Sequence, residues 1–408
     1  MTITKPNPAT VWVSELNAAR EVREPFAGRG PVRFYDATLR DGEQTVGVVL
    51  SPQQKLEIAH ALDSLGVARI EAGFPRVSAE DAEAITLIQN SGLKAEVWGF
   101  SRAVPADIDE LIRLGVRYSV IEAPTSAIKL RAYGLEREKI IQRVVEAVSY
   151  AAKAGIHVAF FAVDGTRTEL AFLREVYLRA LEAGAKELVV VDTIGACGPE
   201  AAAALVAHVR EWAGAGIPLH WHGHNDFGLA TASAIAAVRA GAEWIQGTVN
   251  GMGERAGNAD NGEIALALAC LYGVPVEMDL TKLREVSEVV RRNSRYELEP
   301  WKPVIGRNLF VRESGAVASQ FHIPEAIEPY AAEIVGAERG IVLGKKSGLD
   351  SIDLKCRELK IELPAELKAS ALAEVKRRSI EKAGLITDDE FREIVRGVLS
   401  QAPKAAAI

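Results

Sequence analysis

The chain has 408 residues, a formal net charge of −7 and a sequence pI near 5.7. This acidic balance argues against a nucleic-acid or anionic-membrane partner, which would select a basic surface. The first ten residues are polar, and no stretch approaches the length of a membrane span. Its three cysteines (Cys197, Cys270 and Cys356) lie far apart and predict no disulfide framework. We therefore expect a globular, cytoplasmic protein without nucleic-acid or membrane partners.

A repeated pattern follows an N-terminal arm at residues 1–30. Amphipathic segments end in a glycine and a short apolar run follows at once, as in Leu65-Gly66-Val67 and Leu114-Gly115-Val116. A glycine just past a helix adopts the left-handed conformation at little cost, so it ends the helix and directs the next strand. The pattern predicts eight strands, at Phe34–Thr38, Ala68–Glu71, Ala95–Phe100, Arg117–Glu122, His157–Val163, Glu187–Asp192, Leu219–His222 and Glu243–Thr248.

Helical segments are predicted between these strands. Examples are Pro52–Leu65, Ser78–Asn90, Glu136–Lys153, Glu169–Glu182, Pro199–Trp212 and Phe227–Arg239, and an apolar helix at Ala259–Leu271 closes the series. Eight strand–helix units are what a (β/α)8 barrel requires. A doubly wound open sheet is the alternative, but it usually has fewer strands, and the chain has no GxGxxG turn. We predict an α/β fold with a (β/α)8 TIM barrel at residues 31–275.

The sequence changes in character after residue 275. A charged helical pattern at Thr281–Arg292 gives way to the Trp-, Pro- and Gly-containing stretch Pro300–Gly306, and a charged helical tail follows. We expect small, mostly helical accessory parts: a linker and accessory subdomain at 276–348 and a helical subdomain at 349–408.

The end of the first predicted strand carries a dense group of polar side chains, Arg40-Asp41-Gly42-Glu43-Gln44. Active sites of α/β barrels form at the carboxyl ends of the strands, so this position favours a site. On this segment alone, a solvated loop with an Arg-Asp ion pair explains the pattern equally well.

The seventh strand ends in alternate histidines, His220, His222 and His224. Alternate residues of a strand point to one face, so His222 and His224 are expected at the same barrel end as Asp41. Two imidazoles and a carboxylate form a plausible divalent-metal site with positions left for substrate. His220 lies deeper and is interpreted as a core histidine or a partner of the ligands.

The eighth strand runs into a loop with three glycines, residues 250–258. Glu254 and Arg255 can brace this loop by an ion pair, and Asn258 then offers an amide oxygen to the metal or to a metal-bound water. A long surface loop is the structural alternative.

Together these segments resemble the DRE-TIM metallolyases, and within them the Claisen-condensing branch of homocitrate, 2-isopropylmalate and citramalate synthases. The resemblance rests on five barrel motifs and extends through Trp301-Lys302-Pro303 to IVLGKKSG at 341–348. The barrel motifs are FYDATLRDGEQ at 34–44, IEAGFP at 70–75, VDTIG at 191–195, HGHNDFGLA at 222–230 and TVNGMGERAGN at 248–258.

The resemblance implies a metal-dependent acyltransferase that joins an acyl-CoA, with acetyl-CoA the first choice, to a 2-oxo acid. It also implies a homodimer in which the segment after Pro300 reaches over the partner's barrel mouth. A divalent cation (Zn, Mn or Mg) is implied at Asp41, His222 and His224, with Asn258 close by.

Catalytic and substrate roles are implied for four further residues. Arg40 polarises the ketone of the oxo acid, and Thr193 holds its carboxylate. Glu43 and Gln44 orient water and substrate.

Departures from the family pattern fall in the accessory segment and in the oxo-acid pocket. Arg312 and Val317 replace the histidines of a His-Glu-Ser-Gly-x-His motif, and Ile327 replaces a tyrosine. On the fifth strand, Ala159 and Phe161 stand where homocitrate synthases carry an arginine and a serine.

We therefore expect poor use of 2-oxoglutarate, because phenylalanine desolvates a carboxylate without pairing it. Lys129, in the loop after the fourth strand, is a candidate for binding a different anion, although as a flexible point charge.

Two other functions stay open from the sequence. The same metal and Arg40 would also serve a lyase or aldolase that cleaves a related hydroxy acid. A non-catalytic barrel retained for protein interactions is the third reading, disfavoured because the whole set of site residues is present together.

Overall fold

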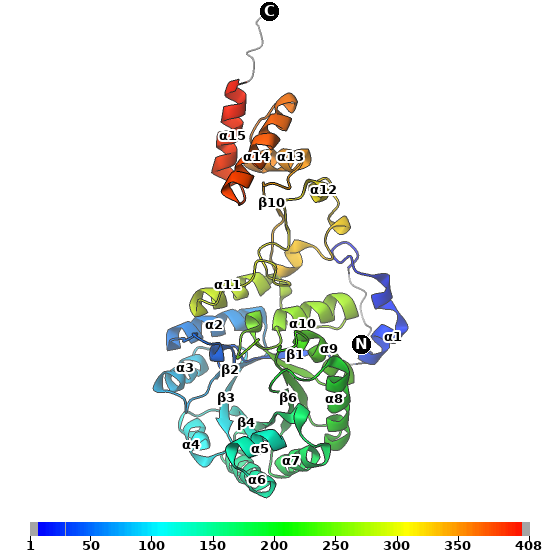
Figure 1. The fold of residues 1–408 in the computed structure, drawn as a ribbon. Helices are drawn as coiled ribbons and strands as arrows, with labels where there is room; N and C mark the ends of the chain where they lie inside the picture. Colours follow the sequence, from blue (N-terminus) through cyan, green and yellow to red (C-terminus); the bar gives the residue numbers. More distant parts are fainter. Residues whose placement is uncertain (1–6, 29, 402–408) are drawn as a thin grey trace, which may run out of the picture. The chain divides into compact units, whose positions relative to one another are not determined.

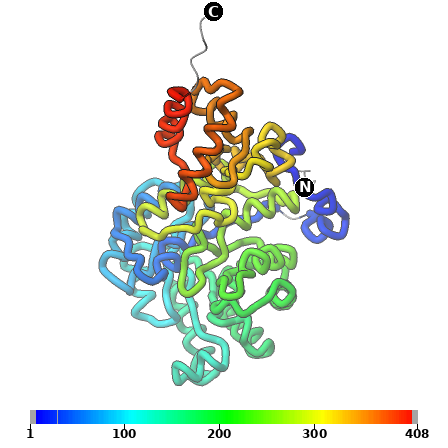
Figure 2. Tube along the Cα trace, turned by 45° about the horizontal axis from the view of Figure 1, so that its top comes forward, coloured from blue at the N-terminus to red at the C-terminus, as the bar shows by residue number. Residues whose placement is uncertain are grey.

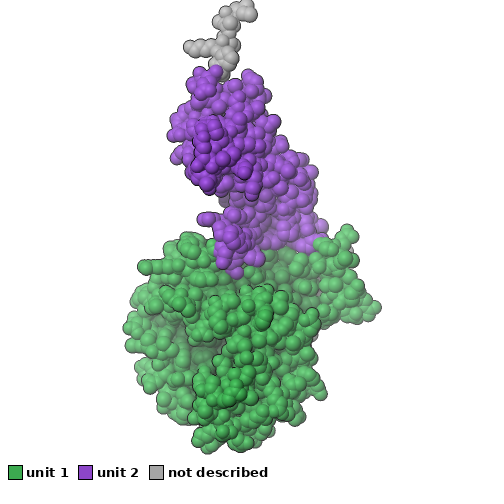
Figure 3. All heavy atoms as spheres, viewed as in Figure 1, with its two compact units in different colours: residues 1–6, 14–298 green, residues 7–13, 299–408 purple. Residues whose placement is uncertain are grey.

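A computed structural model of the chain describes residues 7–28 and 30–401. These residues form two compact units, one of residues 14–298 and one of residues 7–13 with 299–401 (Figure 3). The limits expected from the sequence, at residues 30, 275 and 348, stay predictions, and parts of the predicted arm and tail (1–6, 29 and 402–408) lie outside the described residues. Within the described ranges, no helix is both long and apolar enough to cross a membrane.

The first unit is a closed barrel of eight parallel strands, which confirms the predicted TIM barrel (Figure 1). Figure 2 traces the chain from a second direction. Strand β8 closes the ring by pairing in parallel with β1. The strands are β1 (Arg33–Asp36), β2 (Arg69–Gly73), β3 (Glu96–Arg102), β4 (Tyr118–Pro124), β5 (His157–Val163), β6 (Glu187–Asp192), β7 (Leu219–Gly223) and β8 (Trp244–Gly247).

A ring of helices surrounds the barrel, and local sequence signals mark the ends of several of them. Ser51 begins α2 with a reciprocal capping box to Gln54, and Gly66 ends it at φ 87°. The helices are α2 (Pro52–Leu65), α3 (Ala79–Gln89), α4 (Pro105–Arg113), α5 (Ala127–Tyr133), α6 (Arg137–Lys153), α7 (Leu170–Glu182), α8 (Pro199–Ala213), α9 (Ala230–Ala240), α10 (Asn261–Ala267) and α11 (Leu283–Ser294). The short helix α1 (Arg20–Arg23) precedes the barrel, and a π-helical turn at Leu268–Tyr272 follows α10.

Inward-facing side chains fill the barrel in layers. An aromatic and aliphatic cluster includes Tyr35, Trp98, Phe100, Val120 and Phe161. Strand register places Phe100 beside Val120, and Val120 beside the fully buried Ala159. The interior is therefore a packed core rather than a pore.

The second unit has its own apolar core, formed by residues such as Ile352, Val375 and Phe391. It contains a two-stranded parallel sheet and mostly short helices. Its elements are β9 (Val311–Arg312), α12 (Gly315–Ala318), β10 (Gly340–Ile341), α13 (Leu349–Leu359), α14 (Lys368–Lys382) and α15 (Asp388–Gln401).

Candidate active site

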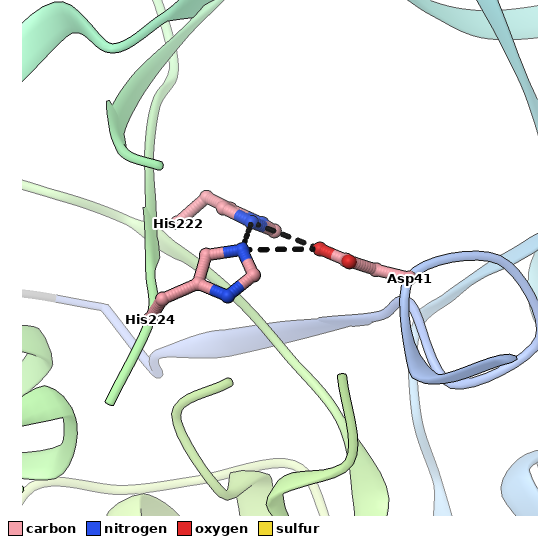
Figure 4. A group of neighbouring side chains, drawn as sticks. All are labelled: Asp41, His222 and His224. Atoms are coloured by element: carbon pink, nitrogen blue, oxygen red, sulfur yellow. Dashed lines mark hydrogen bonds and ion pairs between the residues drawn. The ribbon is translucent and has the colours of Figure 1, made fainter. Parts of the chain in front are cut away.

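A carboxylate and two imidazoles meet at the carboxyl end of the barrel strands, called the mouth below (Figure 4). All three side chains (Asp41, His222 and His224) are buried. Asp41 Oδ2 lies 3.1 Å from His222 Nε2 and 3.6 Å from His224 Nε2, and the two Nε2 atoms are 3.4 Å apart. Two nitrogens bound at about 2.1 Å to one tetrahedral zinc lie roughly 3.4 Å apart. The triangle therefore has the dimensions of a divalent-cation site.

Local backbone structure places these side chains. After β1 the chain folds into a tight turn in which the N–H groups of Arg40, Asp41 and Gly42 all donate to Ala37 O, at 2.8–3.1 Å. This turn aims Asp41 across the mouth. His222 is the inward residue near the end of β7, and His224 follows just beyond it in an antiparallel bridge with Asn258.

The protonation states suit ligands of a cation. Burial alone would raise the pKa of Asp41, but the Arg40 charge and hydrogen bonds from both imidazoles hold it well below its usual value. Burial lowers the pKa of His222 to about 4, against the opposing influence of Asp41. A charged carboxylate and a neutral imidazole are the forms that bind metals.

The loop after β8 brings an amide oxygen to the same place. Asn258 is buried, its Nδ2 donates to Met252 O at 3.1 Å, and its Oδ1 has no hydrogen-bond partner among the described residues. Gly257 has φ 83°, and a Cβ there would lie 1.9 Å from Gly251 O, so only glycine allows this path. Arg255 braces the loop through Glu254 (3.2 Å), as expected, and also through Asp226 (2.9 Å).

Arg40 is fixed beside the metal triangle. Its Nε donates to Glu71 Oε2 at 2.6 Å, its Nη1 lies 3.4 Å from Asp41 Oδ2, and its guanidinium stacks 4.2 Å above the Phe100 ring. Its Nη2 is buried without a hydrogen-bond partner in the described structure. A buried donor without a partner is costly, which makes this atom a candidate to bind a ligand acceptor.

Glu43 and Gln44 line a cavity of about 710 Å³ that Arg40 also borders. The Glu43 carboxylate is already engaged, because it accepts from Leu50 N at 2.7 Å and from the buried Lys55 ammonium at 2.6 Å. The Gln44 side chain is exposed. The structure thus brings both residues to the edge of the mouth rather than into the metal triangle.

The remaining candidates lie on other strands and loops. Thr193 follows β6, and its Oγ1 accepts from Asp164 N at 2.7 Å. The Phe161 ring lies 5.0 Å from the His222 ring, edge to face. Lys129 lies in the first turn of α5, with its backbone N–H capped by Ser126 Oγ, and its ammonium forms no hydrogen bond or ion pair with any described residue.

Two acidic residues of the site were given no role from the sequence. Glu71 on β2 is fully buried between Arg40 and the Tyr35 hydroxyl (2.9 Å), and burial raises its pKa. Glu122 on β4 is partly buried, and burial raises its pKa to about 7. The signal that could have identified both is an isolated acid within a predicted buried strand.

His220 belongs to a separate cluster near the opposite end of the barrel. Its Nε2 lies 2.5 Å from Glu187 Oε2, and His157 Nε2 lies 2.7 Å from Glu187 Oε1. Arg69 binds both oxygens of the same carboxylate, at 2.6 and 3.0 Å. His220 is thus a core histidine, one of the two roles considered for it.

Comparisons with known proteins identify the family of the chain. The HMGL-like family profile matches residues 31–290. Homocitrate synthase AksA of Methanopyrus kandleri is 42% identical over 370 residues, 90% of this chain and 92% of that protein. The 2-isopropylmalate synthase of Methanocaldococcus jannaschii is 40% identical, covering 91% of this chain and 73% of that one. A putative (R)-citramalate synthase of Archaeoglobus fulgidus is 41% identical, covering 90% and 75%.

Solved structures with the same fold are more distant in sequence. The HMG-CoA lyase of Bacillus subtilis superposes with a TM-score of 0.58 at 19% identity, over 66% of this chain and 96% of that chain. The carboxyl transferase domain of Rhizobium etli pyruvate carboxylase gives 0.52 at 19% identity, over 67% and 49%.

The chain belongs to the HMGL-like family. The resemblance to the Claisen-condensing DRE-TIM enzymes is therefore confirmed, and the chain is an acyltransferase like these synthases.

Proposed function

We propose that this enzyme condenses an acyl-CoA, acetyl-CoA in the first instance, with a 2-oxo acid on a divalent cation held by Asp41, His222 and His224. The observation that carries the proposal is the buried triangle of ligand atoms beside two unpartnered groups, Arg40 Nη2 and Asn258 Oδ1. Sequence similarity to three kinds of synthase supports condensation over cleavage.

The donor set favours zinc or manganese over magnesium, which prefers oxygen ligands. When bound, the cation would supply Lewis-acid stabilisation of oxygen charge that develops during carbon–carbon bond formation. Asn258 Oδ1 would complete the polar shell, either directly or through water.

The chain's own residues would orient the oxo acid. Arg40 Nη2 would donate to the ketone oxygen, where alkoxide charge appears only as the new bond forms. Glu71 and the Phe100 ring keep the guanidinium rigid, so little reorganisation is needed during the reaction. Thr193 Oγ1, which already accepts from Asp164 N, would use its proton to hold the substrate carboxylate.

Arg312, at a position where related synthases carry histidine, has a structural role in the second unit. Its guanidinium donates to the carbonyls of Leu309 (2.5 Å) and Val311 (3.1 Å), and pairs with Glu328 at 3.4 Å.

Release of free CoA thiol tests the proposal. Metal-loaded enzyme with acetyl-CoA and a panel of 2-oxo acids should release thiol in an oxo-acid-dependent manner. Thiol release in the absence of any oxo acid, or no thiol release with any member of the panel, would contradict the proposal. Cleavage of a hydroxy acid without CoA would instead support the lyase alternative.

We also propose that the enzyme is a cytoplasmic homodimer. The support is the family resemblance and the small size of the second unit. A monomeric mass by light scattering at micromolar concentration would contradict the dimer.

A further inference from the structure

The wall of the barrel mouth holds a carboxylate that accepts no hydrogen bond from any described residue. Glu122 follows Val120, a residue of the barrel interior, by two positions on β4. Its side chain therefore points to the same inward face, one layer nearer the mouth. Strand register places it between Arg102 on β3 and Phe161 on β5. The Phe161 ring in turn contacts His222, so Glu122 is next to the region that the oxo-acid side chain would enter.

Apolar side chains cluster beside Glu122 on the β5 side. The Phe161 ring lies 6.2 Å from that of Phe100, which packs against Phe74 at 5.4 Å. Val163, the next inward residue of β5, packs against the same cluster. An oxo-acid side chain placed here would meet aromatic and aliphatic surface and one carboxyl group.

Nearby cations are committed to other groups. The Arg102 guanidinium donates two hydrogen bonds to Asp107, at 2.8 and 2.9 Å. Arg40 is bound to Glu71 and Asp41. No hydrogen bond or ion pair to the Glu122 carboxyl is found among the described residues, and burial raises its pKa to about 7. Burial outweighs the attraction of Arg40 and Arg102, and no described residue donates a hydrogen bond to the carboxylate.

We propose that Glu122 is a specificity-determining residue that selects 2-oxo acids whose side chain carries a hydrogen-bond donor, a hydroxyl or an amine. This inference rests on the proposed function, because it assumes that the oxo acid binds at the metal triangle. A donor from the substrate would supply the partner that Glu122 lacks.

The same geometry disfavours a second carboxylate on the substrate. Above about pH 7, where Glu122 is deprotonated, that group would face a like charge and the Phe161 ring, which offers no hydrogen bond. An apolar side chain would fill the space but leave the carboxyl unpaired. Selectivity for a donor follows from the difference between these costs.

Binding to Mn²⁺-loaded enzyme without acyl-CoA tests the inference independently of turnover. Calorimetric titrations would compare 2-oxobutyrate with 4-hydroxy-2-oxobutyrate, and phenylpyruvate with its 4-hydroxy and 4-amino derivatives. The variants are Glu122→Leu and Glu122→Gln, and the matched control is Glu175→Gln, an exposed acid on α7.

In at least one series, a donor-bearing member should bind wild-type enzyme about tenfold or more tightly than its apolar counterpart. Glu122→Leu should abolish this preference, and the control should retain it. Because glutamine keeps an acceptor but no charge, Glu122→Gln should weaken binding of a cationic amine more than that of a hydroxyl.

Equal binding within every series, no binding of any panel member, or a preference that survives Glu122→Leu would overturn the inference. Thiol release, measured in parallel, separates the two claims. A Glu122-dependent preference without thiol release would contradict condensation but support the role of Glu122 in selectivity. Thiol release without the preference would support condensation but contradict that role.

Discussion

The two ends of the barrel hold similar side chains but differ in how many of their polar atoms are hydrogen-bonded. Near the amino ends of the strands, Glu187 binds Arg69, His157 and His220, and Arg69 lies between the rings of Trp98 and Trp244, 4.6 and 3.6 Å from their centroids. At the mouth, the corresponding set is Asp41, Arg40, His222 and His224.

The difference lies in what each cluster leaves unpaired. Both Glu187 oxygens are bound by two kinds of donor, and His220 uses both ring nitrogens, the second towards Gln246 at 3.1 Å. The mouth keeps four buried atoms without partners in the described structure: Arg40 Nη2, His222 Nδ1, His224 Nδ1 and Asn258 Oδ1. Single unpaired atoms also occur elsewhere, as at Gln246 Oε1 beside His220, but buried polar atoms are normally satisfied, so four together favour the mouth as the site.

The group of Glu187, Arg69, His157 and His220 is called the closed cluster below. Breaking it should have the largest effect, which is a loss of stability. Glu187→Gln removes one of two counter-charges of the buried Arg69, which also pairs with Glu96 at 2.8 Å, and we expect a loss of about 3 kcal/mol in unfolding free energy. Metal content at the mouth should be unchanged. Chemical unfolding with metal analysis of the folded fraction checks both, and an unaltered stability would show that the cluster is not structural.

The group of Asp41, Arg40, His222 and His224 at the mouth is called the open cluster below. Altering it should reduce catalysis rather than stability. Arg40→Lys retains a cation for Glu71 but loses the planar fork, so kcat should fall by about 10²–10³ with metal retained. The control is Arg113→Lys, an exposed ion-pair residue on α4. Steady-state thiol release measures the effect. Near wild-type kcat would remove Arg40 from the reaction.

The two ends should also respond to pH with opposite signs. Burial raises the folded pKa of Glu122 to about 7, so its contribution to stability is present below pH 4.5 and is lost as pH rises to 7. Although burial opposes it, hydrogen bonds from the histidines and Arg69 lower the folded pKa of Glu187, so its contribution is present above 4.5 and is lost in acid.

Glu122→Gln should therefore gain stability over wild type, by about 2 kcal/mol, as pH rises from 4.5 to 7. The loss of unfolding free energy caused by Glu187→Gln should become smaller as pH falls below 4.5. Unfolding of the metal-free proteins at several pH values measures both differences, and parallel pH profiles would contradict the contrast between the two ends.

The smallest expected effect concerns the oxo-acid pocket. Phe161→Ser should raise kcat/KM for 2-oxoglutarate about tenfold, because a hydroxyl replaces a ring that cannot pair with the distal carboxylate. Ala159 is left unchanged, since it lies fully buried in the interior layer, where an arginine would overpack the core. Efficient use of 2-oxoglutarate by wild-type enzyme would contradict this account of the pocket.

Much of the barrel could be predicted from sequence because its signals are local. The observed bounds of β5, β6 and α2 are those predicted, since glycine and capping residues mark their ends. The start of α9 was placed three residues early. Gly228, at φ 70°, makes a turn before it, and Asn225 Oδ1 accepts from Ala230 N. That contact depends on the folded loop, which sequence spacing does not reveal.

The meeting of Asp41 with His222 and His224 was predictable because the carboxyl ends of barrel strands share one face. The lack of a hydrogen-bond partner for Glu122 could not be predicted from the sequence. It depends on which strands flank β4 and on Arg102 being bound by Asp107 five residues further along. The engagement of Glu43 by Lys55 is equally a product of the fold.

Metal content after exhaustive dialysis tests the central claim most directly. Wild-type protein should retain one divalent cation per chain, and His222→Ala should retain none while unfolding cooperatively. The matched control, His157→Ala, removes a histidine beside Glu187 and should retain one. Unchanged metal content in His222→Ala, or an equal loss in His157→Ala, would contradict the assignment of the open cluster as the metal site.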